Sequence, residues 1–317
     1  MKTVTAANRI AQAPRTRSAW KRRVVRNRYM YLMILPGLIY FLVFKYLPMW
    51  GLIISFQDYV PFQGILHSPW VGFKQFNRLF TDPDFWGIFR NTLSLFLLNI
   101  VFYTPVPIVL AIMLNEVAHP FFKRIVQTIV YIPHFLSWVI VVSISFVMLT
   151  LDGGIVNEML RYFGFGEINF LLDSAYSRPL YILQTIWREA GWGTIVYLAA
   201  IASIDPGLYE AARMDGAGRF RQIWHITFPA IRSVVIVLLI LRIGSVMDHS
   251  FEHVFLLINS MNRQVMDIFD TYVFTAGVQQ GQYSYTTAVG FFKSFIGLAL
   301  VMLSNWLARR FGEEGVY

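Results

Sequence analysis

Six long apolar runs restrict the folds open to this chain more than any other feature of its sequence. They cover residues 29–56, 92–114, 125–149, 180–202, 230–258 and 287–308. A helix needs about 20 apolar residues to cross a bilayer, and lipid offers no hydrogen-bond partner to an unpaired backbone group. The runs therefore predict an all-α integral membrane protein with about six transmembrane helices.

The composition supports this class and excludes several kinds of site. Hydrophobic residues make up 56% of the chain and charged residues only 14%, whereas about 25% of the residues in a soluble domain are charged. The chain has no cysteine, which excludes disulfides, iron–sulfur clusters and thiolate zinc sites.

Residues 1–28 form a basic segment directly before the first apolar run. This segment holds nine lysines and arginines and no acidic residue. Such a segment stays in the cytoplasm and is attracted to anionic lipid head groups. No basic domain with interleaved aromatics follows, so nucleic-acid binding is disfavoured. A cleavable signal peptide is disfavoured too, because the first run is longer than an h-region of ~7–15 residues.

Charge predicts the orientation of the spans. The segments assigned to the cytoplasm hold seventeen lysines and arginines, and the opposite segments hold six. Because basic residues are enriched in cytoplasmic loops, both termini are expected in the cytoplasm, which fits an even number of spans. The membrane domain is then expected over 29–310, with a cytoplasmic tail over 311–317.

Two of the segments assigned to the outer side carry local structure signals. Within 57–91, Asp82 and Pro83 predict the start of a short interfacial helix that ends near Arg90. Within 150–179, glycines predict turns around a short amphipathic piece. The two halves of the chain show no internal repeat, which disfavours the inverted-repeat secondary transporters.

The loop over residues 203–229, between the fourth and fifth runs, is the most informative segment. Asp205 is a good helix N-cap, and Pro206 at the first helical position has no N–H to leave unpaired. Good helix formers follow, and Gly216 and Gly218 predict a sharp reversal with positive φ. The result is a short helix held off the membrane, a shape suited to a groove on a soluble partner.

At these residues the sequence resembles a known family. The run EAARMDGAGRFRQIWHITFPAI (210–231) is similar to the coupling-helix motif of binding-protein-dependent ABC importer permeases, in which Glu-Ala-Ala precedes Asp-Gly-Ala and a later proline. FKYLPMWGLIISFQDY (44–59), WVGFKQFNRLF (70–80), NTL (91–93) and YIPHFLSWVIV (131–141) resemble polysaccharide and oligosaccharide permeases of the carbohydrate-uptake class. The likeness covers about 30–310, nearly the whole chain.

The resemblance implies a fold, a cargo and partners. The fold is that of a type I ABC importer permease in the bacterial cytoplasmic (inner) membrane. The cargo is an oligosaccharide or polysaccharide, for which an acidic sugar such as alginate is one candidate. The implied partners are a second related permease, two ATPase subunits and a periplasmic or extracellular solute-binding protein.

The resemblance also assigns the residues that couple transport to ATP. These are Glu210, Ala211, Ala212, Arg213, Asp215, Gly216, Ala217 and Gly218. The alternative interpretation is an amphipathic surface loop with accidental similarity. The chain has no G-x-x-x-x-G-K-[ST] phosphate loop, so we expect no enzyme activity or cofactor here, and ATP and Mg²⁺ on the partner subunits.

The fifth run supplies candidates for the substrate path, because charges inside spans usually face a water-filled cavity or a partner. They are Arg242, Asp248, His249, Glu252 and His253. Carboxylates and imidazoles could bind sugar hydroxyls, and Arg242 could bind the carboxylate of an acidic sugar. Pairing between helices or subunits near the outer surface is an equal alternative. A metal site is disfavoured without an H-E-x-x-H arrangement.

The other spans offer further path candidates. Those in the fourth run are Trp187, Arg188, Glu189, Trp192 and Tyr197, and those elsewhere are Lys293, Asn99 and Tyr103. Aromatic faces can stack on sugar rings, but tryptophan and tyrosine also favour membrane interfaces for ordinary reasons. Replacing Glu252 or Lys293 by alanine is expected to lower transport while leaving assembly with the ATPase intact.

Two rival classes remain open at this point. A membrane-embedded transferase would need clustered acidic residues at a membrane face, yet Asp82 with Asp84 and Asp267 with Asp270 stand as separate pairs. A secondary transporter would show the missing internal repeat. Copurification of an ATPase separates the importer from both, and import rather than export rests on the resemblance alone.

Overall fold

The computed structural model describes residues 26–244 and 251–310, and these residues are helical apart from turns and one isolated bridge between Gln57 and Trp70. The chain divides into two units, Met1–Ile53 and Ile54–Tyr317. In the first unit, α2 (Arg28–Phe41) continues into a π-helical turn (Leu42–Tyr46) and then into a 3-10 helix (Leu47–Phe56) that leads into the second unit. Together these residues match the first predicted span.

The second span is longer than its apolar run. Asp82 caps α5 (Pro83–Leu98) by accepting a hydrogen bond from the Asp84 N–H at 3.0 Å, so the predicted helix start is confirmed. The prediction that this helix ends near Arg90 is wrong. It runs on through a π-helical turn (Asn99–Tyr103) and α6 (Pro105–Glu116) as one 34-residue span. Nothing near Arg90 stops the helix, and its buried face continues through it.

The third span is broken. It consists of α7 (Pro120–Tyr131), a 3-10 turn (Ile132–Phe135) and α8 (Trp138–Leu149), with a bend of 100° between the two α-helices. Pro133 cannot donate to the helix ladder, and Ser137 caps the new helix by accepting a hydrogen bond from Ile140. Residues 125–149 therefore do not form the single uninterrupted membrane-spanning helix that the sequence predicted.

The fourth span, α10 (Ser174–Ala202), begins with a cap from Asp173 and is followed by α11 (Pro206–Met214) at 70°. Next come α12 (Arg219–Gln222), a π-helical turn (Ile223–Thr227), α13 (Phe228–Gly244) and α14 (Phe251–Leu257). The last span is α17 (Tyr283–Arg310). Within the described residues, four helices are long and apolar enough to cross a membrane, or up to six if each bent pair counts once.

Short helices fill the connections. They are α3 (Gly64–His67), α4 (Lys74–Thr81), α9 (Ile155–Tyr162), α15 (Arg263–Met266), α16 (Phe269–Tyr272) and a π-helical segment (Val273–Gln279). The amphipathic piece predicted within 150–179 is α9. It lies between Gly153 and Gly164, whose φ angles are 75° and 80°.

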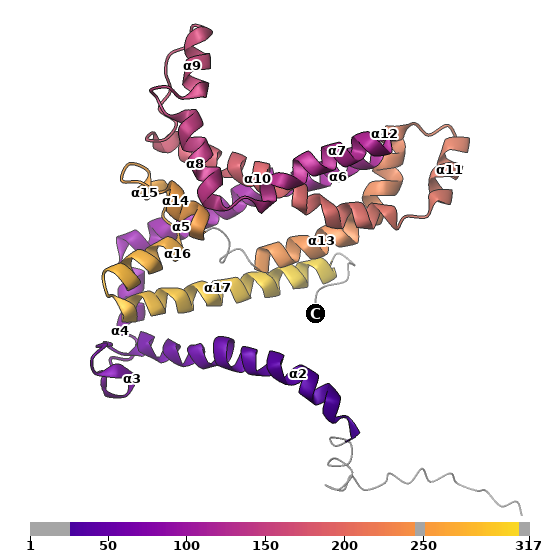
Figure 1. Ribbon diagram of the computed structural model, residues 1–317. Helices are drawn as coiled ribbons and strands as arrows, with labels where there is room; N and C mark the ends of the chain where they lie inside the picture. The colour runs from indigo at the N-terminus through magenta and orange to yellow at the C-terminus, as the bar shows by residue number, and fades with distance from the viewer. Residues whose placement is uncertain (1–25, 245–250, 311–317) are drawn as a thin grey trace, which may run out of the picture. The chain divides into compact units, whose positions relative to one another are not determined.

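The spans of the second unit pack along one another. α6 packs on α10, and α13 packs on both α10 and α17 (Figure 1). Aromatic residues fill the core where α4, α5, α16 and α17 meet, including Phe85, Phe269 and Tyr285. The crossing of α7 and α10 is especially close, because a Cβ on Gly191 would lie 1.9 Å from the carbonyl oxygen of Val130.

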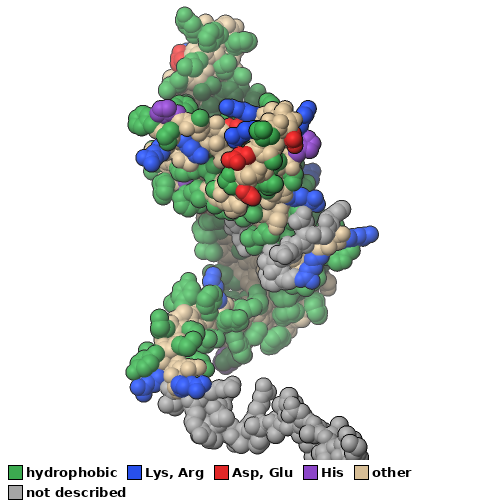
Figure 2. Space-filling model, turned by 90° about the vertical axis from the view of Figure 1, so that its right-hand side faces the viewer, with side chains coloured by type: hydrophobic (Ala, Val, Ile, Leu, Met, Phe, Trp, Pro, Cys, Tyr) green, Lys and Arg blue, Asp and Glu red, His purple; other side chains and the backbone are tan. Residues whose placement is uncertain are grey.

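Large hydrophobic side chains lie on the surface as well as in the core. Many on α2, α8 and α17 are more than 36% exposed. Hydrophobic side chains also cover much of the face seen in Figure 2, while charged side chains of both signs gather at the α11 end. Apolar surface of this extent is expected where lipid or another subunit covers it.

Candidate functional site

The helix α11 is closed at both ends by local hydrogen bonds. At its start, the Asp205 side chain accepts from the Gly207 N–H at 2.9 Å, and Pro206 occupies the first position, as predicted. At its end, the Gly216 N–H donates to Arg213 at 3.0 Å and the Ala217 N–H donates to Ala212 at 2.8 Å. These two bonds form a Schellman motif, which requires positive φ at Gly216, observed at 75°.

Gly218, the second glycine of the predicted reversal, has a different structural role from Gly216. Gly218 has φ −68° and ψ 166°, so the prediction of positive φ there is wrong. It is the extended N-cap residue of α12, and the reversal needs only one left-handed residue because α12 begins immediately afterwards. Gly216 alone therefore carries the turn.

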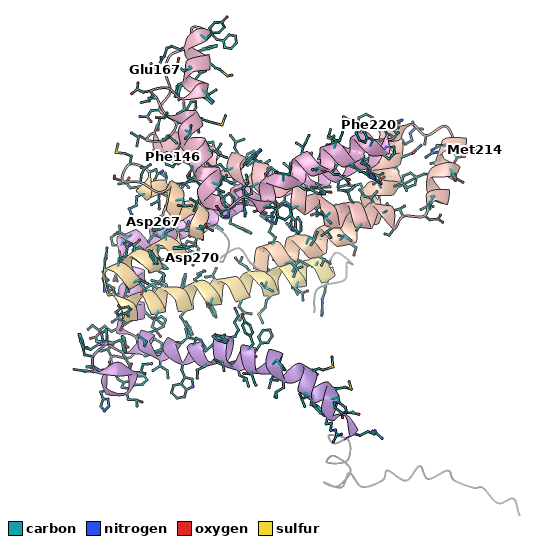
Figure 3. The ribbon with its side chains drawn as sticks, in the orientation of Figure 1. Phe146, Glu167, Met214, Phe220, Asp267 and Asp270 are labelled. Atoms are coloured by element: carbon teal, nitrogen blue, oxygen red, sulfur yellow. The ribbon has the colours of Figure 1, made fainter. Side chains whose placement is uncertain are left out.

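The outward face of α11 is free for contact with another protein. No residue of α11 is buried within this chain. Met214 is 89% exposed and Phe220, just beyond the turn, is 90% exposed; both lie at the α11 end of the second unit (Figure 3). The Tyr209 hydroxyl lies 2.9 Å from the Thr227 hydroxyl, which ties α11 to the following span. A short rigid helix is thus presented at the end of the bundle.

A cavity of about 510 Å³ lies among α5, the π-helical turn that follows it, α8, α10, α13, α14 and α16. Six of the predicted path residues line it: Asn99, Tyr103, Arg188, Glu189, Arg242 and His253. They come from four different segments of the chain, so the fold brings together residues that sequence reasoning named separately. This volume falls within the roughly 300–1,000 Å³ of ligand pockets.

Other predicted path residues do not line this cavity. Trp187 is half exposed, Trp192 stacks on His134, and Tyr197 is buried in the α6–α10–α13 core. Glu252 is exposed on α14. Lys293 is not a lining residue, but its Nζ donates a hydrogen bond at 2.5 Å to Asp270, which lines the cavity. Asp248 and His249 lie outside the described residues, as do residues 1–25 and 311–317.

The sequence analysis did not assign the other lining residues to the path, among them Trp138, Tyr181 and Asp270. The two aromatics stand in apolar spans, where nothing in a single sequence separates a cavity wall from a lipid-facing surface. Asp270 was noted only with Asp267, as an acidic pair that a membrane-embedded transferase could use. In residues 26–244 and 251–310, no three His, Cys, Asp or Glu side chains come together as metal ligands would.

One wall of the cavity is a column of stacked groups. The His253 ring stacks on Trp138 with centroids 3.7 Å apart and on Tyr181 at 4.6 Å. The Arg188 guanidinium lies over the Trp138 ring at 4.4 Å. His253 Nε2 lies 2.7 Å from the amide oxygen of Gln184, which can only accept, so this nitrogen carries the proton. The column thus joins α8, α10 and α14.

Polar contacts fix the charged groups of the cavity. Arg188 Nε donates to the Leu136 carbonyl at 2.7 Å, and its Nη1 pairs with Glu189. The other Glu189 oxygen lies 2.9 Å from His134 Nδ1. Because Leu136 and His134 belong to the break between α7 and α8, the same contacts hold that break against α10.

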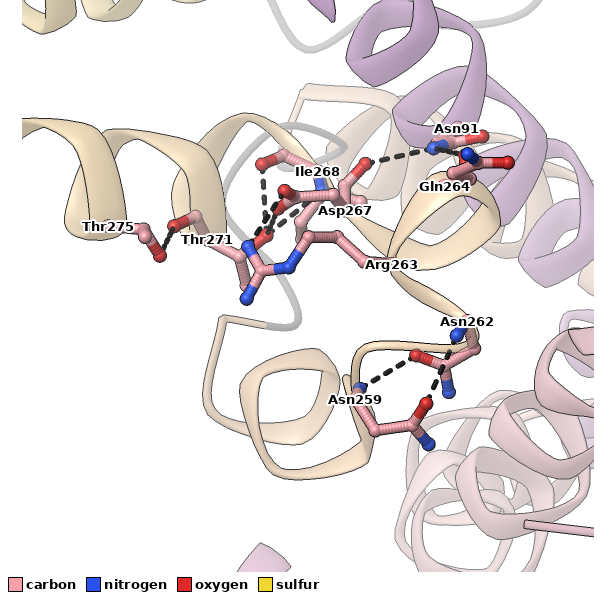
Figure 4. Close-up of polar contacts among 9 residues, drawn as sticks. All are labelled: Asn91, Asn259, Asn262, Arg263, Gln264, Asp267, Ile268, Thr271 and Thr275. Atoms are coloured by element: carbon pink, nitrogen blue, oxygen red, sulfur yellow. Dashed lines mark hydrogen bonds and ion pairs between the residues drawn. The ribbon is translucent and has the colours of Figure 1, made fainter. Parts of the chain in front are cut away.

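The end of the second unit that carries α15 and α16 is held by a network of side-chain to backbone hydrogen bonds (Figure 4). Asn91 Nδ2 donates to the carbonyls of Gln264 and Asp267, at 2.8 and 3.2 Å. Burial raises the pKa of Asp267, and hydrogen bonds from Thr271 and Arg263 partly offset this rise. These contacts make the segment a fixed part of the fold rather than a loose loop.

Comparison with known proteins decides the family. Residues 103–313 match the model of the family described as binding-protein-dependent transport system inner membrane component. The chain belongs to this family. The sequence resemblance and the expected inner-membrane location are therefore confirmed.

Individual relatives match over nearly the whole chain. The polygalacturonan/rhamnogalacturonan transport system permease protein YteP of Bacillus subtilis (strain 168) is 64% identical over 295 residues, covering 93% of this chain and 92% of the relative. Protein LplB of the same organism is 52% identical over 299 residues, covering 94% of each.

A solved structure confirms the fold of this family member. A chain of the bacterial alginate ABC transporter, solved in complex with alginate pentasaccharide-bound periplasmic protein, superposes with a TM-score of 0.87 at 40% identity. The match covers 94% of this chain and 99% of that chain. The protein thus has the type I ABC importer permease fold that the resemblance implied.

Proposed function

We propose that this chain is the permease subunit of an ATP-driven importer whose cargo is an acidic oligosaccharide. The proposal is supported by its family, by its likeness to a permease named for polygalacturonan and rhamnogalacturonan transport, and by its likeness to the alginate transporter. In this scheme a solute-binding protein delivers the sugar, and a second related permease completes the pathway. Both termini and α11 face the cytoplasm.

The observation that carries the proposal is the exposed α11, capped at both ends and free of packing on its outer face. We assign it as the coupling helix, with Glu210 and Arg213 offering charged contacts and the alanines allowing close approach to an ATPase subunit. ATP and Mg²⁺ bind to those partner subunits. When ATP closes the ATPase pair, the docked helices move together and the spans rotate between inward-open and outward-open states.

The cavity serves as the passage for the sugar in this scheme. Asn99, Tyr103 and Tyr181 offer hydrogen-bonding groups suited to hydroxyls, and Phe96 and Leu241 offer apolar surface suited to the C–H faces of sugar rings. Lining groups from several spans change their spacing whenever these spans rotate. The same rotation that ATP drives would therefore load and release the cargo.

ATP hydrolysis by the reconstituted complex tests the coupling assignment. With loaded binding protein present, Glu210→Ala is expected to abolish most of the substrate-stimulated hydrolysis while the complex still assembles. Glu158→Ala is the matched control, because Glu158 is an exposed glutamate on α9, away from α11. Full stimulation of the Glu210→Ala complex would contradict the role of that residue. Failure of any ATPase to copurify with the unmutated chain would remove the importer assignment.

A further inference from the structure

We propose that the loop over residues 57–72 is a lipid anchor, which inserts Phe62 and Leu66 into the surface of the membrane. Phe62 is fully exposed and Leu66 is 85% exposed, so neither is covered by other residues of the part of the chain that the structure describes. The short helix α3 belongs to this loop, and it lies at the opposite end of the second unit from α11 (Figure 1). With α11 in the cytoplasm, the anchored leaflet is the outer one.

The 57–72 loop is held together by two buried polar side chains, so the exposure of its tip is built into the fold. The Ser68 hydroxyl accepts from the Val60 N–H at 3.1 Å and donates to the Gly64 carbonyl at 2.7 Å. The side-chain amide of Gln57 donates to the Ile65 carbonyl at 2.9 Å. Both polar side chains are fully or almost fully buried. The chain therefore spends buried hydrogen bonds on a shape that leaves two large apolar side chains outside.

The backbone of the loop's tip is also paired within the loop. The N–H groups of Gln63 and Gly64 donate to the Val60 carbonyl at 3.0 and 3.1 Å, and the Ser68 N–H donates to the Gly64 carbonyl at 3.2 Å. A segment that dips into lipid needs such internal partners, because lipid offers no replacement for water at an unpaired N–H or carbonyl. A loop that faces water has no such need. The pairing on both sides of Phe62 thus fits an apolar surrounding.

The charges of the loop are few and lie at its base. Residues 57–72 contain no lysine or arginine, one carboxylate, Asp58, and one histidine, His67. Asp58 pairs with Lys74 at 2.6 Å and accepts from the Gln75 side-chain amide at 2.7 Å. Trp70 is exposed where the loop closes, and tryptophan favours the membrane–water interface. An apolar tip above a polar, tryptophan-bearing base matches the gradient from acyl chains to head groups.

The base of the loop is tied to the ends of membrane spans, which brings the tip to the bilayer surface. The Val71 N–H donates to the Phe56 carbonyl at 2.9 Å, so the loop closes where the first span ends. The Tyr59 N–H donates at 2.8 Å to the hydroxyl of Ser284, in the first turn of the last span, α17. A loop fixed to two span ends lies within reach of the lipid head groups.

Lipid fits this tip better than a docked protein does. Protein interfaces carry about one hydrogen bond per 100–200 Å², and a tip whose backbone is paired internally and which bears no charge offers few partners for them. Binding to a membrane surface instead grows with the apolar area that is buried. The anchor is independent of the sugar that the importer carries.

Spin-label accessibility in the assembled complex, reconstituted in liposomes, tests the inference. The chain has no cysteine, so Phe62→Cys and Leu66→Cys each give one labelling site once cysteines of the partner subunits are replaced. Asp152→Cys is the matched control, because Asp152 is an exposed charged residue in a turn of the 150–179 segment. Labels at 62 and 66 are expected to collide with a charged, water-soluble metal complex about tenfold less often than the label at 152, because that complex does not enter lipid. Their collisions with molecular oxygen, which dissolves well in lipid, should be at least as frequent as those at 152.

Two results would overturn the inference. Collisions with the metal complex as frequent at 62 and 66 as at 152 would place the tip in water. Low rates with both the metal complex and oxygen would place it in a protein interface, as would a fall in oxygen collisions when loaded binding protein is added. Two separate labelling sites keep the test decisive if one label prevents assembly. Each outcome leaves the importer assignment intact, because that assignment depends on ATPase copurification and the Glu210→Ala assay.

Discussion

The sequence analysis predicted that Lys293, in the sixth span, contributes to transport. The structure gives this lysine a specific neighbour. It pairs with Asp270 at 2.5 Å, and both side chains are largely buried, at 13% and 23% exposed. Removing one member of such a pair leaves an uncompensated charge, whereas removing both does not. The pair therefore lends itself to a rescue experiment.

Lys293→Met is expected to raise the Kd of trigalacturonate for the assembled complex and to lower its melting temperature. The reason is that the Asp270 carboxylate on the cavity wall then lacks its ion pair with Lys293. Asp270→Asn combined with Lys293→Met should restore most of both properties. Thermal unfolding and equilibrium binding on the two variants measure this. A double variant as impaired as Lys293→Met would show that the lysine acts through something other than Asp270.

Residue roles were predictable where local chemistry decides them. Asp205, Pro206 and Gly216 behave as their side chains dictate, because caps and turns depend on neighbours in sequence. The aromatic path candidates were less predictable. Tyr197 packs in the core while Trp138 lines the cavity, although both are aromatic residues in apolar spans. Only the three-dimensional arrangement distinguishes them.

At the scale of elements, the close crossing of α7 and α10 depends on one glycine. A Cβ at residue 191 would lie 1.9 Å from the carbonyl oxygen of Val130 and 2.6 Å from its carbon, and backbone cannot move aside as a flexible side chain can. The contact lies close to the break in the third span, so a shift here reaches His134 and Leu136. A single methyl group should therefore disturb the cavity wall.

Gly191→Ala is expected to lower the stability of the complex by about 1–3 kcal/mol or more, the usual effect of overpacking. Gly87→Ala is its control, because Gly87 lies in α5 with no atom within 4 Å of an added Cβ. Alanine there should be neutral or stabilising by up to about 1 kcal/mol. Thermal unfolding of the purified complexes compares them. Equal stability of the two variants would contradict the close crossing.

The transmembrane helices were predictable from the lengths of the apolar runs, but their extensions and bends were not. The six runs correspond to α2, α5–α6, α7–α8, α10, α13–α14 and α17 with their flanking turns. Hydropathy could not show that α5 extends the second span outward, because Phe85 and Ile88 are buried by other elements rather than by lipid. Nor could it show a 100° bend between Phe135 and Trp138, within an uninterrupted apolar run.

At the scale of the whole molecule, family and fold were predictable because the motif of 210–231 and its companions span nearly the entire chain. The cavity was not, since its walls come from distant parts of the chain, with Thr92 and Asp270 lying 178 positions apart. Apolar surface on α8 and α2 is where partner subunits or lipid must be accommodated.

The most direct test of the central claim is accumulation of labelled trigalacturonate by liposomes that contain the full complex, with ATP inside and loaded binding protein outside. The account predicts accumulation above the external concentration that requires ATP and is lost in Glu210→Ala. Accumulation that proceeds without ATP and follows an imposed proton or sodium gradient would contradict it and indicate a secondary transporter.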